Sequence, residues 1–164
     1  SFSASAITAG IFYLVAYAIT NFGSWGIVIA LEEADGKGLE LDDYAGLGRS
    51  NPLMAAAMTI FMLSLIGLPP TLGLVGKLYL FQTVVAIDMY WLAVVGVLTS
   101  LISAYYYLRV VVIMYMREGE PKISTESWLN FSWMLMAVLT VVLSLRPAIL
   151  FDWASNAVIR LLTF

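Results

Sequence analysis

The sequence predicts an all-α integral membrane protein with about four transmembrane helices. Of its 164 residues, 62% are hydrophobic and only 12% are charged, whereas a soluble domain is about one-quarter charged. Such a chain cannot cover its surface with polar groups in water, so a bilayer is the solvent that suits it. Its hydrophobic residues also lie in runs near the roughly 20 residues that a helical crossing needs.

Side chains on which several kinds of chemistry depend are absent from the sequence. It has no cysteine and no histidine, which excludes disulfides, thiolate metal sites, thiol catalysis and histidine-based proton transfer. The net charge of −3 is small, and we expect lipid rather than nucleic acid to be a partner. Because Ser1 rather than Met begins the sequence, we expect a processed product or part of a longer polypeptide.

The first predicted span covers about residues 6–31 and carries a polar stripe at helical spacing. The stripe consists of Tyr13, Tyr17, Thr20, Asn21 and Ser24. Such side chains commonly form hydrogen bonds to a neighbouring helix, or they could line a water-containing proton path. We take Tyr17 and Asn21 as candidates for the path. The polar loop that follows, residues 32–51, matches no phosphate-binding or metal-binding loop.

The second predicted span is interrupted at Gly67–Pro70, between helical runs at 52–68 and 71–88. Proline lacks a backbone donor and clashes with the preceding turn, so no continuous helix should pass through Pro69 and Pro70. By length alone, each run could cross the membrane separately. A single broken crossing places Lys and Arg five against two on the two sides, whereas two crossings give three against four. The positive-inside bias therefore favours one broken crossing. The five are Lys37, Arg49, Arg109, Arg117 and Lys122, and the two are Arg146 and Arg160.

Two further spans complete the predicted fold. The span at 90–116 has a second polar stripe, from which we take Ser103 and Tyr106 as path candidates, although tyrosines near a helix end also anchor it at the headgroups. The last span, about 128–145, has no ionisable residue and is expected to be scaffold. The tail to Phe164, with Trp153 and Arg160, is expected to form an interfacial amphipathic segment.

Lys77 is the candidate functional residue, because it lies in the hydrophobic run directly after the interruption. A charge near the bilayer centre costs at least about 2.5–3.5 kcal/mol, and snorkelling relieves this only near helix ends. The freed carbonyls at 65–68 can accept hydrogen bonds from the ammonium. A lysine balanced between burial and these carbonyls could gain and release a proton. We take Thr71, at the same interruption, as a further candidate for holding water.

The segment from Ser64 to Phe81, SLIGLPPTLGLVGKLYLF, resembles the antiporter-like membrane subunits of respiratory complex I, the bacterial NADH–quinone oxidoreductase. DYAGL at 43–47 and AYYYLRVVV at 104–112 resemble the same family. The resemblance implies the C-terminal part of a fourteen-helix fold, with residues 1–116 in the second antiporter-like repeat and 117–164 as terminal helix and tail. It also implies that Lys77 is that repeat's proton-carrying lysine, in the bacterial inner membrane.

The resemblance further implies that this chain holds no redox cofactor, and that quinone reduction in other subunits drives its proton transfer. Its expected partners are the other membrane subunits of complex I. Two alternatives stay open. The GxPPxxGxxGK pattern is shared with Mrp-type cation/proton antiporters, which exchange sodium for protons. The chain could also be an inert scaffold in which Lys77 is held in a salt bridge.

Overall fold

A computed structural model describes residues 2–32, 39–124 and 126–162 of the chain and confirms the all-α prediction. In the described residues every regular element is helical. The elements are α1 (Phe2–Leu31), the 3-10 helix η1 (Leu41–Tyr44), α2 (Leu47–Ser50), α3 (Pro52–Ile66), α4 (Leu72–Val85), α5 (Tyr90–Met116), α6 (Ser127–Leu145) and α7 (Pro147–Leu162).

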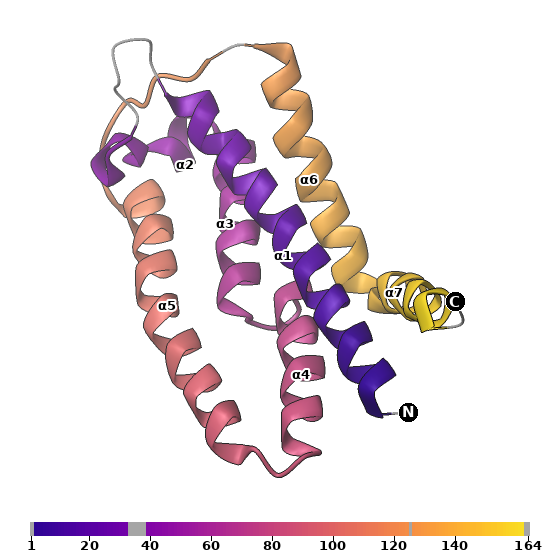
Figure 1. Cartoon of the computed structure of the whole chain (residues 1–164). Helices are drawn as coiled ribbons and strands as arrows, with labels where there is room; N and C mark the ends of the chain where they lie inside the picture. Colours follow the sequence, from indigo (N-terminus) through magenta and orange to yellow (C-terminus); the bar gives the residue numbers. More distant parts are fainter. Residues whose placement is uncertain (1, 33–38, 125, 163–164) are drawn as a thin grey trace.

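The long helices alternate in direction, as consecutive membrane crossings must (Figure 1). α1 rises from the N-terminus to the end of the molecule that carries η1 and α2. α3 and α4 then descend one after the other, α5 returns, and α6 descends again. Among the described residues, α1, α5 and α6 are long and apolar enough to cross a membrane, while α3 and α4 are shorter apolar helices.

The structure supports one broken crossing and corrects the lengths expected for its two parts. α3 has 15 residues and α4 has 14, or about 22 and 21 Å of helix, and neither covers a hydrocarbon core of about 30 Å. The expectation that each run could cross alone is therefore wrong. The runs are shorter than predicted because α3 stops at Gly67, before the prolines, and α4 ends at Val85 rather than at Asp88.

Local sequence explains where α3 begins and ends. Pro52 occupies its first position, where a missing donor does no harm, and the Asn51 side chain accepts a hydrogen bond from the Met54 amide at 3.2 Å. At the other end Gly67 adopts φ +86°, in the left-handed region. That conformation is open to glycine and strained for residues with a Cβ, so Gly67 is the residue on which α3 can stop.

The interruption separates two hydrophobic clusters. The larger cluster joins α1, α2, α3, the end of α5 and α6, around fully buried side chains such as Ile27, Leu47 and Phe61. The smaller one joins α1, α4 and α7, around Phe12, Leu72 and Ala154. Each half of the broken crossing is therefore fixed in its own cluster, and the non-helical residues 67–71 lie between them.

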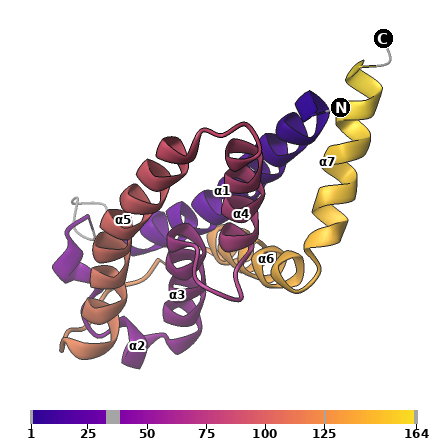
Figure 2. The same ribbon diagram turned by 90° about the horizontal axis from the view of Figure 1, so that it is seen from below.

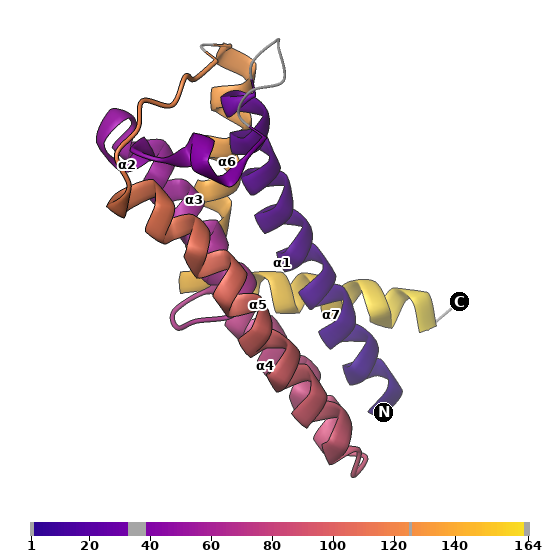
Figure 3. The ribbon, with the colours of Figure 1, turned by 90° about the vertical axis from the view of Figure 1, so that its left-hand side faces the viewer.

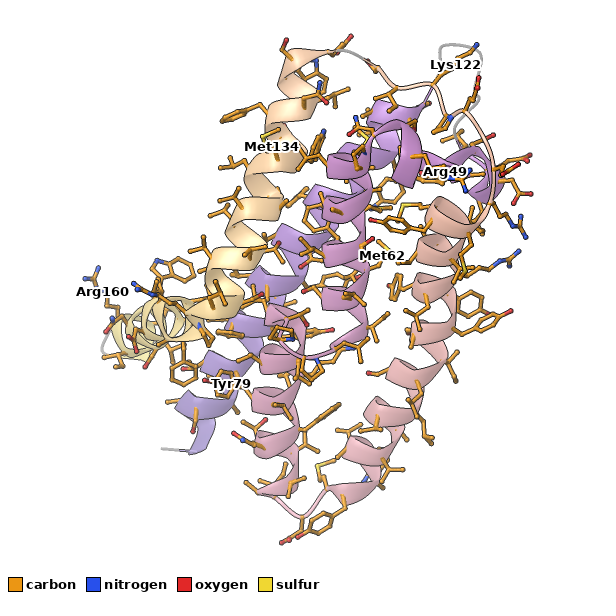
Figure 4. All side chains as sticks on the ribbon, turned by 180° about the vertical axis from the view of Figure 1, so that it is seen from behind. Arg49, Met62, Tyr79, Lys122, Met134 and Arg160 are labelled. Carbon is orange, nitrogen blue, oxygen red and sulfur yellow. The ribbon has the colours of Figure 1, made fainter. Side chains whose placement is uncertain are left out.

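Charged residues gather at the end of the molecule that holds the loop and the connector between α5 and α6. Arg49 lies 3.4 Å from Glu118, and Arg117 pairs with Asp42. Figure 4 shows Arg49 and Lys122 at this end and Arg160 on α7 away from it. This distribution agrees with the division expected for one broken crossing. Lys37 and the acidic residues Glu33 and Asp35 lie outside the described residues.

α7 lies across the other helices rather than along them (Figures 1 and 3). Seen from below, it lies beside the start of α1 (Figure 2). It buries Leu150, Ala154 and Val158, while Trp153 stays 58% exposed. One side of α7 therefore packs on the protein, while Trp153 on another side stays exposed. Its position at a membrane interface, and the division of the chain at residue 116, stay predictions.

Candidate functional site at the helix interruption

Lys77 on α4 reaches back over the interruption to the last turn of α3. Its Nζ donates to the carbonyl oxygens of Leu65 at 3.0 Å and Ile66 at 2.8 Å. The third donor of the ammonium goes to Ser100 Oγ on α5, at 3.2 Å. A lysine ammonium has three donors, so all of them have partners. These partners are neutral, and in the part of the chain that the structure describes no carboxylate pairs with Lys77.

The position of Lys77 follows from how α3 ends. The last carbonyls of a helix lack partners within that helix and carry its negative partial charge. Gly67 leaves room for the lysine above these carbonyls, because a Cβ built there would lie only 3.0 Å from Lys77 Cδ and 3.4 Å from Nζ. The same glycine therefore ends α3 and admits the side chain that satisfies its exposed carbonyls.

α4 begins in close contact with α3. A Cβ on Gly73 would lie 1.7 Å from the backbone oxygen of Ser64, so only glycine allows this approach. The amide of Gly73 donates to Ser64 Oγ at 3.2 Å. Gly76, one turn later, faces the ring of Tyr13 on α1, where a Cβ would be 3.1 Å from Cδ2. These two glycines set the distance between Lys77 and the neighbouring helices.

A small cavity lies beside Lys77, between α1, α3 and α4. Its polar lining comes from Tyr13, Tyr17, Thr20, Ser64 and Lys77. Its volume open to water centres is about 10 Å³, close to the minimum for a single water molecule. Thr20 Oγ1 and Ser64 Oγ approach to 3.4 Å within it. The cavity therefore brings hydroxyl-bearing residues of α1 and α3 close to the amine, although most of its lining surface is apolar.

The predicted path residues differ in how near they lie to this cavity. Tyr17 lines it and stacks on Tyr13, with ring centroids 6.0 Å apart. Thr71 is at the interruption, but its hydroxyl donates to the carbonyl of Leu68 at 2.6 Å. Asn21, on the same helix as Tyr17, donates from Nδ2 to that residue's carbonyl at 2.9 Å.

The two candidates on α5 lie farther along that helix from the Lys77 contact. Ser103 donates to the carbonyl of Thr99 within α5. Tyr106 is 61% exposed and makes an edge contact with Tyr105. The structure does not bring either of them to the Lys77 ammonium, and their role in a path stays a prediction.

Sequence reasoning missed several hydroxyl groups at the site. Ser100 belongs to the polar stripe of the span at 90–116, but the stripe alone does not distinguish it from Ser103, one turn away. The stripe consists of Thr99, Ser100, Ser103, Tyr106 and Tyr107. Ser64 lies in the segment before the interruption, and Thr20 in the first stripe, where a bonding role between helices was the expected one. Their contacts depend on how helices pack, and spacing along one helix carries no information about its neighbours.

The described residues contain no group of three or more His, Cys, Asp or Glu side chains that could hold a metal ion. The donors around Lys77 are carbonyl and hydroxyl oxygens together with one amine. This set of groups is suited to hydrogen bonding and to proton transfer through water.

Comparison with known proteins identifies relatives of this chain. Subunit N of NADH-quinone oxidoreductase from Trichlorobacter lovleyi is 39% identical over 158 residues, covering 92% of this chain and 32% of the relative. The protein of the same name from Chloroflexus aggregans is 40% identical over 155 residues, covering 93% of the chain and 32% of the relative. The chain thus spans about a third of the length of these relatives.

A solved structure shares the arrangement of the helices. A chain of respiratory complex I from Thermus thermophilus, solved with bound aureothin, matches with a TM-score of 0.74 and 29% identity. The match covers 92% of this chain and 36% of that one. The model of the NADH:quinone oxidoreductase/Mrp antiporter transmembrane family matches residues 1–103, which include the interruption, Lys77 and Ser100. This chain therefore belongs to the NADH:quinone oxidoreductase/Mrp antiporter transmembrane family.

Proposed function

We propose that this chain is part of a proton-translocating subunit N of NADH–quinone oxidoreductase, and that Lys77 carries the proton in mid-membrane. The observation that carries the proposal is the set of partners of the ammonium: two helix-end carbonyls and one hydroxyl. These neutral partners stabilise the positive charge of Lys77 through their dipoles, and no carboxylate of the described residues pairs with it. The protonation of such an amine responds to any charge that approaches or leaves it.

The cavity supplies a route by which the proton could reach or leave the amine. Tyr17, Thr20 and Ser64 line it together with Lys77. Tyr17 is therefore the first candidate for the water file, while Asn21, Thr71, Ser103 and Tyr106 would act farther from Lys77. Lys77 is only half-buried in this chain. Since lipid cannot satisfy an ammonium, we propose that other parts of the protein or its partner subunits cover it.

Partners and location follow from the same proposal. The subunit would lie in the bacterial inner membrane among the other membrane subunits of complex I. Quinone reduction in those subunits would change the charge near Lys77 and so load or unload its proton. This sequence supplies no cysteine or histidine, the usual ligands of iron–sulfur clusters and haem, and we place the redox cofactors in other subunits.

Replacing Lys77 in the full-length protein tests the proposal. In the assembled complex in membrane vesicles, we expect Lys77→Ala to lower the number of protons pumped per NADH oxidised. Lys77→Arg should fail as well, because a guanidinium effectively never releases its proton. Lys122→Ala is the matched control, since it removes a lysine from the connector 117–126 and should pump normally. An unchanged proton-to-electron ratio in Lys77→Ala would refute the assignment.

Pumping assays in the same vesicles distinguish proton translocation from sodium/proton exchange. The matching family includes Mrp antiporters, whereas the relatives compared above are named subunit N. We therefore expect proton pumping at an unchanged rate when sodium is replaced by potassium. Pumping that requires sodium would favour the antiporter interpretation.

A further inference from the structure

We propose that Ser144, on α6, is a positioning residue that caps the start of α4 and thereby fixes Lys77 over the end of α3. This inference rests on the proposed function of Lys77. α6 has no ionisable residue, and the sequence indicates only a scaffold role for it. The structure gives one of its hydroxyls a specific contact, because the amide of Leu72 donates to Ser144 Oγ at 2.8 Å.

The contact supplies a hydrogen-bond acceptor to the first turn of α4, which its N-cap residue does not supply. The first amides of a helix lack intrahelical acceptors, and a threonine at the N-cap normally supplies one. Thr71 holds that position, but its hydroxyl donates to Leu68 and makes no cap. The first two amides, of Leu72 and Gly73, are instead bonded by Ser144 on α6 and Ser64 on α3.

Ser144 is itself fixed in orientation. Its hydroxyl donates to the carbonyl of Thr140 at 2.6 Å, one turn back along α6, which leaves the oxygen's lone pairs free to accept from Leu72. The Leu72 side chain is fully buried and packs in the cluster of α1, α4 and α7. The start of α4 is therefore held by a backbone contact to α6 and by a buried side chain.

This anchor controls the geometry at Lys77. Lys77 lies five residues after Leu72, or about 7.5 Å along the helix, and its ammonium must meet carbonyls on a different helix. A small shift or fraying of the first turn of α4 would lengthen its contacts with Leu65 and Ile66. Ser144 therefore acts on the protonation of Lys77 through the position of α4, without touching the amine.

Removing the hydroxyl tests this role in the full-length subunit within the assembled complex. We expect Ser144→Ala to lower the initial rate of proton pumping by about fivefold, the effect of losing one net hydrogen bond. The pH profile of pumping should also be displaced by about half a unit, because the contacts of Lys77 change. Ser144→Thr keeps the hydroxyl and should restore both properties.

A control on the same helix separates positioning from general stability. Thr140→Val removes a buried hydroxyl that donates only to Met136 within α6, so the pH profile should stay unchanged. A wild-type rate and pH profile in Ser144→Ala, with pumping lost in Lys77→Ala, would overturn this inference alone. Normal pumping in Lys77→Ala would instead refute the proposed function. If Ser144→Ala assembles poorly and Ser144→Thr does not restore the pH profile, the hydroxyl is not a cap and the inference is also wrong.

Discussion

The ammonium of Lys77 is stabilised by dipoles alone within the described part of the chain. Placing a charge in mid-membrane costs at least about 2.5–3.5 kcal/mol. Hydrogen bonds to a charged group contribute about 1.5–3 kcal/mol each, so the three bonds of Lys77, two of them to the negative end of α3, can offset this cost. The balance therefore depends on contacts that a shift of α4 by about one ångström would weaken.

Gly67 is the residue on which these contacts most directly depend. We expect Gly67→Ala to destabilise the protein by about 1–2 kcal/mol, because φ is +86° there and a left-handed conformation strains other residues. The new methyl group would also displace Lys77, whose Cδ is 3.0 Å from the Cβ position, and so lower the proton-to-electron ratio. Thermal inactivation of the purified complex and pumping assays measure the two effects.

Gly10→Ala provides the comparison for that variant. Gly10 lies inside α1, and a Cβ there would meet no atom within 4 Å, so alanine should leave pumping unchanged and raise stability slightly. If both variants behaved alike, the special geometry of Gly67 would have no functional consequence.

At the scale of a single residue, the sequence predicts features that depend only on the covalent structure of one short segment. Pro69 and Pro70 forbid a helix, and Lys77 follows them within a hydrophobic run, so the interruption and its lysine could both be predicted. The exposed carbonyls at 65–68 were expected, and the structure brings two of them to Nζ. Ser100 and Ser144 could not be predicted, because their roles depend on which face of another helix meets α4.

Glycines also determine how closely whole helices pack. Gly23 on α1 faces Phe61 on α3, which is fully buried, and a Cβ on Gly23 would lie 2.2 Å from the ring. We expect Gly23→Ala to cost about 1–3 kcal/mol through overpacking. Adding Phe61→Leu should relieve part of that cost, so that the double variant is more stable than the sum of the single effects.

Thermal inactivation of the complex carrying each single variant and the double variant measures this coupling. Ser64 and Thr20 lie on the same two helices, so a wider α1–α3 spacing should also separate their hydroxyls from the 3.4 Å seen here. Strictly additive effects would mean that Gly23 and Phe61 do not set the distance between α1 and α3.

At the scale of elements, the sequence predicted each long helix but misjudged some ends. The span at 90–116 coincides with α5, because hydrophobic residues recur along its whole length and no proline interrupts it. α1 begins at Phe2 rather than near residue 6, because Ser3, Ala4 and Ser5 are residues with acceptable helix propensity. α3 and α4 were predicted too long, because hydrophobic residues continue beyond both helix ends. α3 ends before Gly67, and α4 ends before the turn at 86–89.

At the scale of the whole molecule, the exposed helix faces and the position of the loops indicate how the chain lies in the membrane. Much of α5 is exposed in this chain, including Leu98, Leu101 and Ile102, as expected for a helix facing lipid or other protein segments. Polar loops and ion pairs occupy one end of the molecule, and the α4–α5 turn lies at the other (Figure 1). This arrangement requires that residues before α3 and after α5 lie on the same side of the membrane.

Single cysteines introduced into this sequence, which has none of its own, can test this topology. We expect Leu39→Cys and Glu118→Cys to react with a membrane-impermeant maleimide from the same side of sealed vesicles, and Ile87→Cys only from the opposite side. Leu101→Cys, in the middle of α5, should be protected from both sides and serves as the control. If α3 and α4 were two separate crossings, residues 39 and 118 would lie on opposite sides. Because the carbonyls of α3 would then no longer point toward α4 within one crossing, that result would also remove the structural basis for Lys77 as a mid-membrane proton carrier.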